Sequence, residues 1–561
     1  MNGRTPQPSR STSLLAPRLL LALLGLLTSC SGQISDAGGS PDDDRRPRPP
    51  SGGRDPEPLV LPTIAELSPY GRLTKPEYRY VAGDLLVGAD ETARRAVLST
   101  VDDFAENNYA GFYQNHTFLQ AEPRLASLQL AFATALARAF PSSDLHRELC
   151  ASGAACGEAF VDELLPRIWK RAIPADERAE LLTLHAELPS ELFFTRVFAS
   201  PYFHFKIFAA EPPTSREVAR KHAHLIAFSL VGTFADEALH ADLDAGRLDD
   251  AGPEVWEPHV RRLLTTNPRR FAVLFLPQWL GMSSLYETDD VYEGVPLRVV
   301  MTEPARTFAT LLADGESIGS LLVPEAHQVE ARLAAIYGKE LVADETGWGP
   351  IDLDATIFGS AAMSAMFVDH ETGYPNPIRR GSYVVNRLLC RDIRFPSSAV
   401  QSEIDRILET VPEGLSPPER MAYLRSHDTC AACHEQFDHY GLALEEIGAL
   451  GEPMTTYYTG DPVEVAGEIG DLAFDSSVDF ARQLGQTREL QTCFAAQVHS
   501  YLSGGGHVEA NRRLRDHADP YLDASIEDVV VEMALLALGF STRSAGSAAD
   551  FSTESIEGED R

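Results

Sequence analysis

The run Cys430-Ala431-Ala432-Cys433-His434 constrains this chain more than any other part of the sequence. A C-x-x-C-H run is the covalent attachment site of a c-type haem, in which two thiols reach the vinyl groups of the porphyrin and the next imidazole becomes an axial ligand of the iron. On a helix, residues three apart share one face, which would place Cys430 and Cys433 together. We expect one haem c per chain, held by Cys430, Cys433 and His434, because the sequence contains one such run.

Two other kinds of site use a C-x-x-C pair. Half of a zinc site is one alternative, but no second pair of cysteines or histidines follows at the spacing that zinc requires. A redox dithiol of the thioredoxin type is the other, but it needs a βαβ context, which the hydrophobic pattern lacks. Haem attachment is therefore the prediction, and it agrees with the signs of export described next.

The first thirty residues predict export and a lipid anchor. Three arginines precede an apolar run from Leu19 to Leu27, and with Thr28 and Ser29 the run has eleven apolar or small residues. A bilayer needs about twenty residues to be spanned, so residues 1–29 are typical of a signal peptide. The run ends at Cys30 and resembles a bacterial lipobox, in which the cysteine is lipidated and becomes the mature N-terminus. An ordinary signal peptide with a chance cysteine is the alternative.

Lipid chains would anchor the mature protein to a membrane without a spanning helix. Ser31 follows the cysteine, and this favours the outer membrane in the enterobacterial sorting pattern. Residues 31–62 are rich in proline and glycine and contain no aromatic residue, which predicts a disordered tether after Cys30. Residues 543–561 are predicted to form a polar tail.

Length and charge limit the classes of function. A chain of 561 residues indicates several domains, at roughly 100–200 residues per domain. The formal net charge is −34, and such an acidic surface repels phosphate, so we predict that the protein does not bind nucleic acid. The hydrophobic fraction of 44% is enough to build packed cores, which excludes disorder for most of the chain.

The remaining chain has helical signals nearly throughout, and long alternating stretches are scarce. We predict a mainly α protein of several consecutive small helical domains, of which the C-terminal one is cytochrome-c-like. Thr74-Lys75-Pro76-Glu77 has the form of a capping box, and Pro166 is expected to kink an apolar helix over 160–169. The other predicted helices are 174–188, one capped by Ser215 that extends past Ile226, 258–264, 268–276, 328–336 and 382–389. The predicted domains are 63–145 (N-terminal helical), 146–200 (helical hairpin), 201–372 (central helical), 373–470 (haem c attachment) and 471–542 (C-terminal helical).

Four cysteines remain once lipid and haem have taken the other three: Cys150, Cys156, Cys390 and Cys493. An even remainder in an exported protein favours two disulfides. Cys150 and Cys156 are near enough in sequence to close a small loop. A bond between Cys390 and Cys493 would then tie residues 480–502 to the helix that begins near Ser382. Four buried thiols are the alternative.

Beyond the haem motif, short segments in a fixed order resemble an exported, cytochrome-c-like family first catalogued in planctomycetes and built from consecutive domains of unknown function. The resemblance covers roughly residues 73–542. Its segments are Leu73-Thr74-Lys75-Pro76-Glu77-Tyr78, Asp84-Leu85-Leu86, the run from Leu165 to Pro174, Gln278-Trp279-Leu280-Gly281, Leu312-Ala313-Asp314, Glu316-Ser317, Tyr337-Gly338, Ile378-Arg379-Arg380-Gly381, Leu388-Leu389-Cys390, Phe437-Asp438 and Gly441-Leu442-Ala443-Leu444-Glu445.

The resemblance implies haem attachment at Cys430, Cys433 and His434 and no settled biochemical role. The sequence departs from the family pattern at two places. His439 stands where the family usually has a proline, and the proline-rich run expected after Cys390 is reduced to Pro396.

The sixth ligand of the iron stays open. Redox cytochromes commonly use methionine or histidine there. His370 and Met454 are the main candidates, the first because the resemblance implies a histidine near that position. His439, Met421 and His427 are weaker candidates. An open sixth position is the alternative, and it would indicate ligand binding or oxygen chemistry.

The leading functional prediction is a cell-envelope lipoprotein that carries one covalent haem c and exchanges electrons with a redox partner protein. The acidic chain would favour a partner with a basic docking face. The first alternative is a haem-dependent oxidase or peroxidase-like enzyme with an open distal site, in which residues 74–338 would form a substrate domain. The second is a surface binding or scaffold lipoprotein.

Overall fold

The computed structural model describes residues 70–104, 124–151, 156–207, 214–282, 291–292, 295–353, 355–369, 373–391, 393, 398–449, 451–504, 513–514 and 524–540. The described part is mainly helical, as predicted. The predicted signal peptide, the lipidation residue Cys30, the tether, the candidate ligand His370 and the tail 543–561 lie outside the described residues. None of the described helices combines the length and the apolar composition that crossing a bilayer requires.

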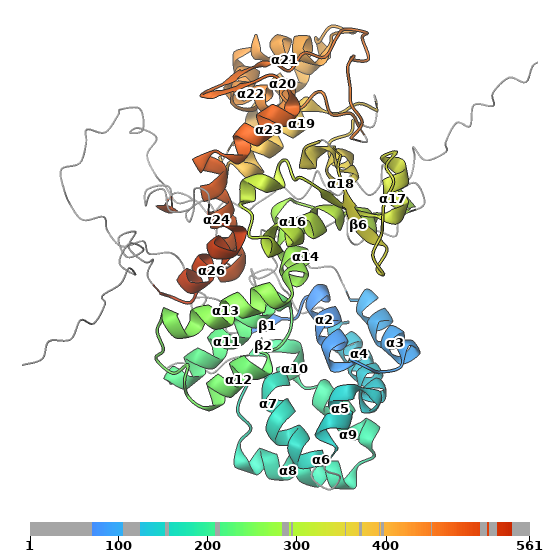
Figure 1. Ribbon diagram of the computed structural model, residues 1–561, viewed down its shortest axis with the longest axis vertical. Helices are drawn as coiled ribbons and strands as arrows, with labels where there is room; N and C mark the ends of the chain where they lie inside the picture. The colour runs from blue at the N-terminus through green and yellow to red at the C-terminus, as the bar shows by residue number, and fades with distance from the viewer. Residues whose placement is uncertain are drawn as a thin grey trace, which may run out of the picture.

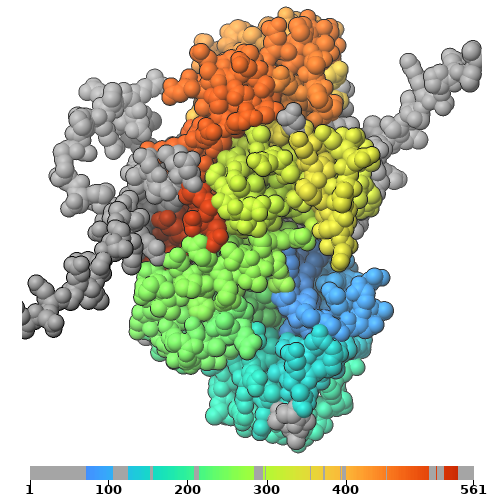
Figure 2. All heavy atoms as spheres, viewed as in Figure 1, coloured from blue at the N-terminus to red at the C-terminus, as the bar shows by residue number. Residues whose placement is uncertain are grey.

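The buried apolar side chains form two large clusters. The first extends from Leu73 to Phe234, so the predicted domains 63–145 and 146–200 have one core in common. The second extends from Ala219 to Leu538 and joins the central, haem-motif and C-terminal segments. The helices of the first cluster lie at one end of the molecule, and α20–α23, near the C-terminus, lie at the other (Figures 1 and 2).

The N-terminal unit, residues 70–207, is a group of short helices closed by one pair of strands. Its elements are β1 (Tyr70–Arg72), α2 (Lys75–Leu85), α3 (Glu91–Asp102), α4 (Leu125–Ala139), η4 (Phe140–Ser142), α5 (Asp144–Leu149), α6 (Cys156–Ala159), η5 (Phe160–Leu164), α7 (Leu165–Ile168), α8 (Ala175–Glu187), α9 (Ser190–Phe198), α10 (Pro201–His204) and β2 (Phe205–Ile207). β1 and β2 pair antiparallel, with Tyr70 opposite Ile207. A buried ion pair between Glu77 of α2 and Lys206 of β2, 2.6 Å long, ties the two ends of the unit together.

Two local predictions for this unit can be compared directly with the structure. The capping box at the start of α2 is confirmed, because Thr74 and Glu77 each bond the backbone amide of the other. The effect of Pro166 on the helix differs from the simple kink that was expected. A π-helical turn, η5, precedes it, and the amide of Leu165 bonds the carbonyl of Phe160. The wider turn accommodates a proline that has no amide hydrogen to donate.

The central unit, residues 214–369, begins with α11, a helix of 17 residues. Its elements are α11 (Ser215–Val231), α12 (Glu237–Asp244), α13 (Pro253–Thr266), α14 (Pro268–Trp279), β3 (Val291–Tyr292), β4 (Val295–Pro296), α15 (Leu297–Val300), α16 (Glu303–Ala313), η7 (Ile318–Leu321), β5 (His327–Glu330), α17 (Ala331–Ile336), β6 (Trp348–Ile351), η8 (Ile357–Gly359) and α18 (Ala361–Ala365).

Three sequence-based boundaries in the central unit were wrong. Thr214, rather than Ser215, caps α11, and it forms a capping box with Glu217. The helix predicted over 258–264 begins earlier, so Pro258 lies inside α13. The helix predicted over 328–336 begins at Ala331, because the preceding residues form β5 and pair with β6. In β5 buried and half-buried residues alternate, which is the two-residue period of a strand.

The haem-motif unit and the C-terminal helices complete the described chain. Their elements are α19 (Pro377–Tyr383), η9 (Val384–Leu388), α20 (Ser398–Glu409), α21 (Pro417–Arg425), α22 (Asp428–Leu442), β7 (Gly467–Ile469), β8 (Leu472–Phe474), α23 (Ser477–Gly485), α24 (Arg488–Ser503) and α26 (Ile526–Ala537). The helix predicted over 382–389 begins at Pro377 and continues as the π-helical turn η9.

Two disulfides join Cys150, Cys156, Cys390 and Cys493, as predicted. Cys150 bonds Cys156, and Cys390 bonds Cys493 of α24 across 103 positions. The Cα atoms of Cys390 and Cys493 are 5.4 Å apart, inside the limit of about 7 Å for a disulfide. Cys390 has a φ of 50°, a left-handed conformation that few non-glycine residues adopt. The second disulfide therefore ties the end of η9 to α24.

Removal of the long-range disulfide should destabilise the protein more than removal of the local one. For Cys390→Ala/Cys493→Ala we expect a loss of roughly 4–5 kcal/mol in the free energy of unfolding, because the bond closes a long loop of the unfolded chain. For the control Cys150→Ala/Cys156→Ala, whose residues are 6 positions apart, the expected loss is about 2 kcal/mol. Urea unfolding of the non-reduced variants measures both. Equal losses would contradict the loop-length explanation.

Candidate functional site

Helix α22 carries the whole C-x-x-C-H run, at the end of the molecule opposite the N-terminal unit (Figure 1). The run lies within one helix, so Cys430 and Cys433 share a face. Asp428 begins the helix, and its negative charge suits the positive end of the helix dipole. The preceding helix α21 begins with a capping box formed by Ser416 and Glu419 and ends at Arg425, so a turn of two residues joins it to α22.

The two cysteines of the C-x-x-C-H run pack against apolar side chains. Cys430 is buried in a small cluster with Ile407 of α20 and Leu424 of α21. Cys433 is half-buried and packs against the larger core. Burial is the main cause that raises the pKa of the Cys430 thiol, and the neighbouring Cys433 adds to it. Among the described cysteines these two lie outside the disulfides. Both thiols therefore stand beside apolar side chains of the kind that a porphyrin ring would contact.

His434 is held by a buried carboxylate one turn along the same helix. Its Nδ1 atom lies 2.9 Å from Oδ1 of Asp438, whose side chain is fully buried. A carboxylate oxygen can only accept a hydrogen bond, so Nδ1 donates the proton. The lone pair of Nε2 is then the one that could bind a metal. This is the usual arrangement of a metal-binding histidine, whose second nitrogen bonds a carboxylate or carbonyl.

Arg425 of α21 completes the chain of contacts behind His434. Its Nη1 atom lies 2.5 Å from Oδ2 of Asp438. Each carboxylate oxygen of Asp438 thus has a separate partner, one cationic and one imidazole. Because Asp438 is buried, the ion pair compensates for the loss of its hydration. The orientation of the His434 ring is therefore set by two helices, α21 and α22.

Two glycines let α19 and α22 cross at close range. A Cβ atom on Gly441 would overlap the carbonyl oxygen of Pro377, and one on Gly381 would overlap the carbonyl oxygen of Phe437. Only glycine leaves room for this approach of two backbones. The crossing therefore fixes the position of the helix that carries the motif.

Arg380 anchors the same crossing from α19. Its side chain is 0% exposed, and it donates hydrogen bonds to the carbonyl oxygens of Leu444, Ile447 and Gly448 at 2.9, 2.7 and 3.2 Å. These carbonyls follow the end of α22, where the helix leaves carbonyl groups without helical partners. Burial lowers the pKa of Arg380 to about 10 and raises that of the neighbouring Glu445 to about 8.

The described candidates for a sixth ligand lie in different surroundings. His439 is exposed on α22, the helix that also carries His434, and Met421 is buried inside α21. Met454 is half-buried and its amide bonds the carbonyl of Glu446 at 2.8 Å. His427 precedes α22, and its buried Nε2 atom has no hydrogen-bond partner among the described residues.

Two segments of the chain match the sequence models of protein families. Residues 357–457 match the family described as protein of unknown function (DUF1588). Residues 219–338 match the family described as protein of unknown function (DUF1592). The two families are typical of planctomycete cytochrome-c-like proteins. No curated protein and no solved structure matches the chain.

The first match contains α19–α22, and with them the whole of the site. The second contains most of α11 and continues through α17. Both families are described as of unknown function, so the matches support the domain composition that the sequence resemblance implies and assign no activity.

Several segments that carry the resemblance contain residues that make contacts between units. Trp279 of α14 donates its indole hydrogen to the carbonyl of Arg387, and Tyr383 of α19 bonds the carbonyl of Leu280. The amide of Ile526 bonds the carbonyl of Glu316, which joins α26 to the central unit. These residues hold the haem-motif unit and the last helix against the central unit.

Sequence reasoning missed the residues that support His434. Asp438 was noted only as part of a segment, although its spacing of four from His434 on a predicted helix is a usable signal. The role of Arg425 had no such signal, because it depends on how α21 packs against α22. The pairing of Gly381 with Gly441 is also visible only once the two helices are placed.

Proposed function

We propose that the chain is a cell-envelope lipoprotein that binds one haem c covalently and transfers electrons. The observation that carries the proposal is the C-x-x-C-H run on a single helix, with the Nδ1 atom of its histidine held by a buried carboxylate. Cys430 and Cys433 would bind the ring through thioethers, and His434 would bind the iron through Nε2. When bound, haem c supplies one-electron redox chemistry.

The protein residues have separate tasks in this proposal. Asp438 and Arg425 orient the imidazole and keep the proton on Nδ1. Ile407 and Leu424 provide apolar surface beside Cys430, which excludes water from the cofactor. His370 or Met454 would bind the sixth position, and an open sixth position is the alternative. Lipid on Cys30 would anchor the protein to the outer membrane without a spanning helix. The acidic chain would favour a redox partner protein with a basic face.

A second candidate function is a haem-dependent oxidoreductase of the oxidase or peroxidase type. The contact between His434 and Asp438 favours it, because a carboxylate on the second ring nitrogen makes the imidazole a stronger electron donor to a metal. An electron-rich ligand stabilises oxidised iron. The two candidates differ in the sixth position, which is filled in a simple electron carrier and open in an enzyme that binds oxygen or peroxide.

Optical spectra of the purified, exported chain test the proposal and separate its two forms. Covalent haem is expected to remain with the polypeptide after denaturation and acid-acetone extraction. Electron transfer with a filled sixth position predicts a reduced spectrum that carbon monoxide leaves unchanged. A spectrum that shifts with carbon monoxide would support the enzyme. A chain that matures without bound haem in a host able to attach haem c would overturn both.

The variant Asp438→Asn should raise the reduction potential of the bound haem. Loss of the carboxylate weakens electron donation by His434 and so destabilises the ferric form. Loss of an outer-shell partner of a metal-bound histidine changes metal affinity or activity roughly tenfold to a hundredfold. A tenfold change in the equilibrium constant of a one-electron reduction corresponds to about 59 mV. We therefore expect a rise of about 60–120 mV in a spectroelectrochemical titration.

Glu435→Gln is the matched control for this variant. Glu435 lies next to His434 on α22 and is exposed, so its removal subtracts the same charge without a contact to the imidazole. Solvent screens an exposed charge, and the potential should change little. Equal shifts in both variants would mean that net charge, rather than the bond to His434, controls the potential.

A further inference from the structure

A pocket of about 410 Å³ lies between the N-terminal unit and the central unit, away from α22. Its walls come from α2, α5, η5 and α7 on one side and from α13, α14 and the turn after α11 on the other. Its volume falls within the usual range for small-molecule sites, roughly 300–1,000 Å³. Nothing in the C-x-x-C-H chemistry uses this pocket.

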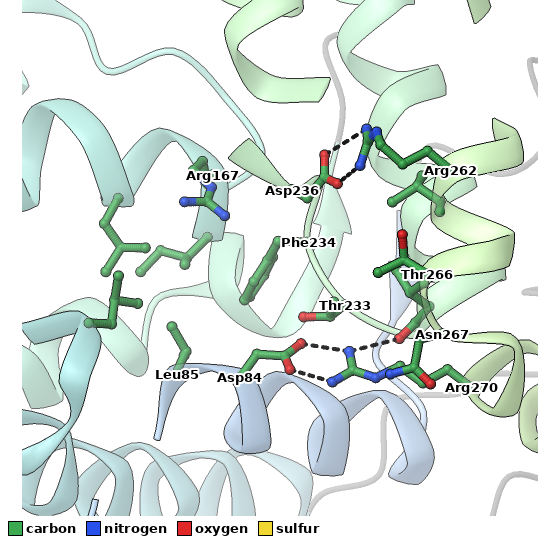
Figure 3. A pocket seen from close by; sticks show the side chains of 15 residues that line it. Asp84, Leu85, Arg167, Thr233, Phe234, Asp236, Arg262, Thr266, Asn267 and Arg270 are labelled. Carbon is green, nitrogen blue, oxygen red and sulfur yellow. Dashed lines mark hydrogen bonds and ion pairs between the residues drawn. The ribbon is translucent and has the colours of Figure 1, made fainter. Parts of the chain in front are cut away.

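Two of the three arginines in the pocket are already paired. Arg262 bonds both carboxylate oxygens of Asp236, and Arg270 bonds both oxygens of Asp84. Each pair is a bidentate contact that neutralises its own charge. In Figure 3 Arg262 and Arg270 extend from α13 and α14 toward their aspartates, and the Phe234 ring lies between Arg167 and the pair of Asp84 with Arg270.

Arg167 is the third arginine of the pocket, and neither of the two aspartates in the pocket pairs with it. Its Nε atom is buried without a hydrogen-bond partner, and its guanidinium forms no ion pair with any described residue. Burial is the main cause that lowers the pKa of Arg167, while the negative charges of Glu237 and Asp84 raise it. Arg167 is half-buried and lines the pocket, so an anion that enters the pocket could bond a guanidinium that no described carboxylate pairs with.

The surroundings of Arg167 define what kind of anion fits. Leu85, Leu145, Leu164 and Ile168 also line the pocket and present apolar surface. The lining side chains carry two aspartates and three arginines, so one positive charge is left uncompensated. A single planar guanidinium beside an apolar wall suits one carboxylate attached to an apolar body.

We infer that this pocket binds a monocarboxylate with an apolar body, of the size of a medium-chain fatty acid, whose carboxylate pairs with Arg167. The fork of the guanidinium would bond both carboxylate oxygens. The apolar body would lie against the leucines and Ile168. The ligand would bridge the two units, because the pocket walls belong to both.

Calorimetric titration of the full exported chain with sodium octanoate tests the inference. The wild-type chain should bind octanoate saturably with one site. Arg167→Gln should weaken this binding roughly tenfold to a hundredfold, as expected for loss of a charge-assisted hydrogen-bonded pair. Arg95→Gln, which removes an exposed arginine from α3, should bind octanoate like the wild type. Octan-1-ol, which has the apolar body without the charge, should bind much more weakly than octanoate.

Thermal unfolding without ligand distinguishes a binding role of Arg167 from a structural one. Arg167→Gln should keep the thermal unfolding midpoint of the wild type or exceed it, because the variant removes a half-buried charge that forms no ion pair with any described residue. A clear fall in that midpoint would assign Arg167 to the fold and overturn the inference. The absence of octanoate binding, equal binding by Arg167→Gln, or equal binding of octan-1-ol would overturn it as well.

Discussion

Cys433→Ala is expected to abolish stable covalent haem attachment. The variant removes one of two thiols that stand three residues apart on α22, and a single thioether cannot hold both vinyl positions of the ring. Haem-dependent peroxidase staining of a denaturing gel should show a stained band for the wild type and a nearly complete loss of stain for the variant. Immunoblotting of the same samples shows how much polypeptide is present.

His439→Ala is the control on the same helix. His439 is exposed and lies one turn beyond the motif, so its loss should leave the haem stain at the wild-type level. His434→Ala should differ from both, because the thioethers remain possible while the axial ligand is lost, and its spectrum should change. An unstained wild type, or full staining of Cys433→Ala, would contradict haem attachment at this motif.

Arg380→Met is expected to be the most destabilising single substitution near the site. The variant leaves the carbonyls of Leu444, Ile447 and Gly448 without their buried donor. An unsatisfied buried polar group costs roughly 1–3 kcal/mol, so the free energy of unfolding should fall by about 6 kcal/mol. The loss should also displace the end of α22, since these carbonyls hold it against α19.

Arg379→Met provides the matched control. Arg379 is the preceding residue of α19 and its side chain is exposed, so the same chemical change removes no buried bond. Its effect should stay within about 0.5 kcal/mol. Urea unfolding followed by circular dichroism compares the two variants. Similar midpoints for Arg379→Met and Arg380→Met would show that the bonds of Arg380 add little to stability.

The local parts of the fold were predictable because they depend on neighbours in sequence. The capping box of Thr74 and Glu77 is made within a single turn, and the C-x-x-C-H run is five consecutive residues. Boundaries were less secure. Residues 328–330 are too few for their sequence pattern to predict a strand. They form part of β5 because they pair with β6.

The sequence alone determined the mainly helical class, and it contains the C-x-x-C-H run on which the proposal of haem attachment rests. Only the tertiary structure decided how that motif is supported. Arg425 reaches Asp438 because α21 packs against α22, and Gly381 meets Gly441 because α19 crosses α22. The pocket of Arg167 depends in the same way on the packing of two units. Such contacts join residues whose separation in sequence carries no periodic signal, so they arise only when helices are placed in three dimensions.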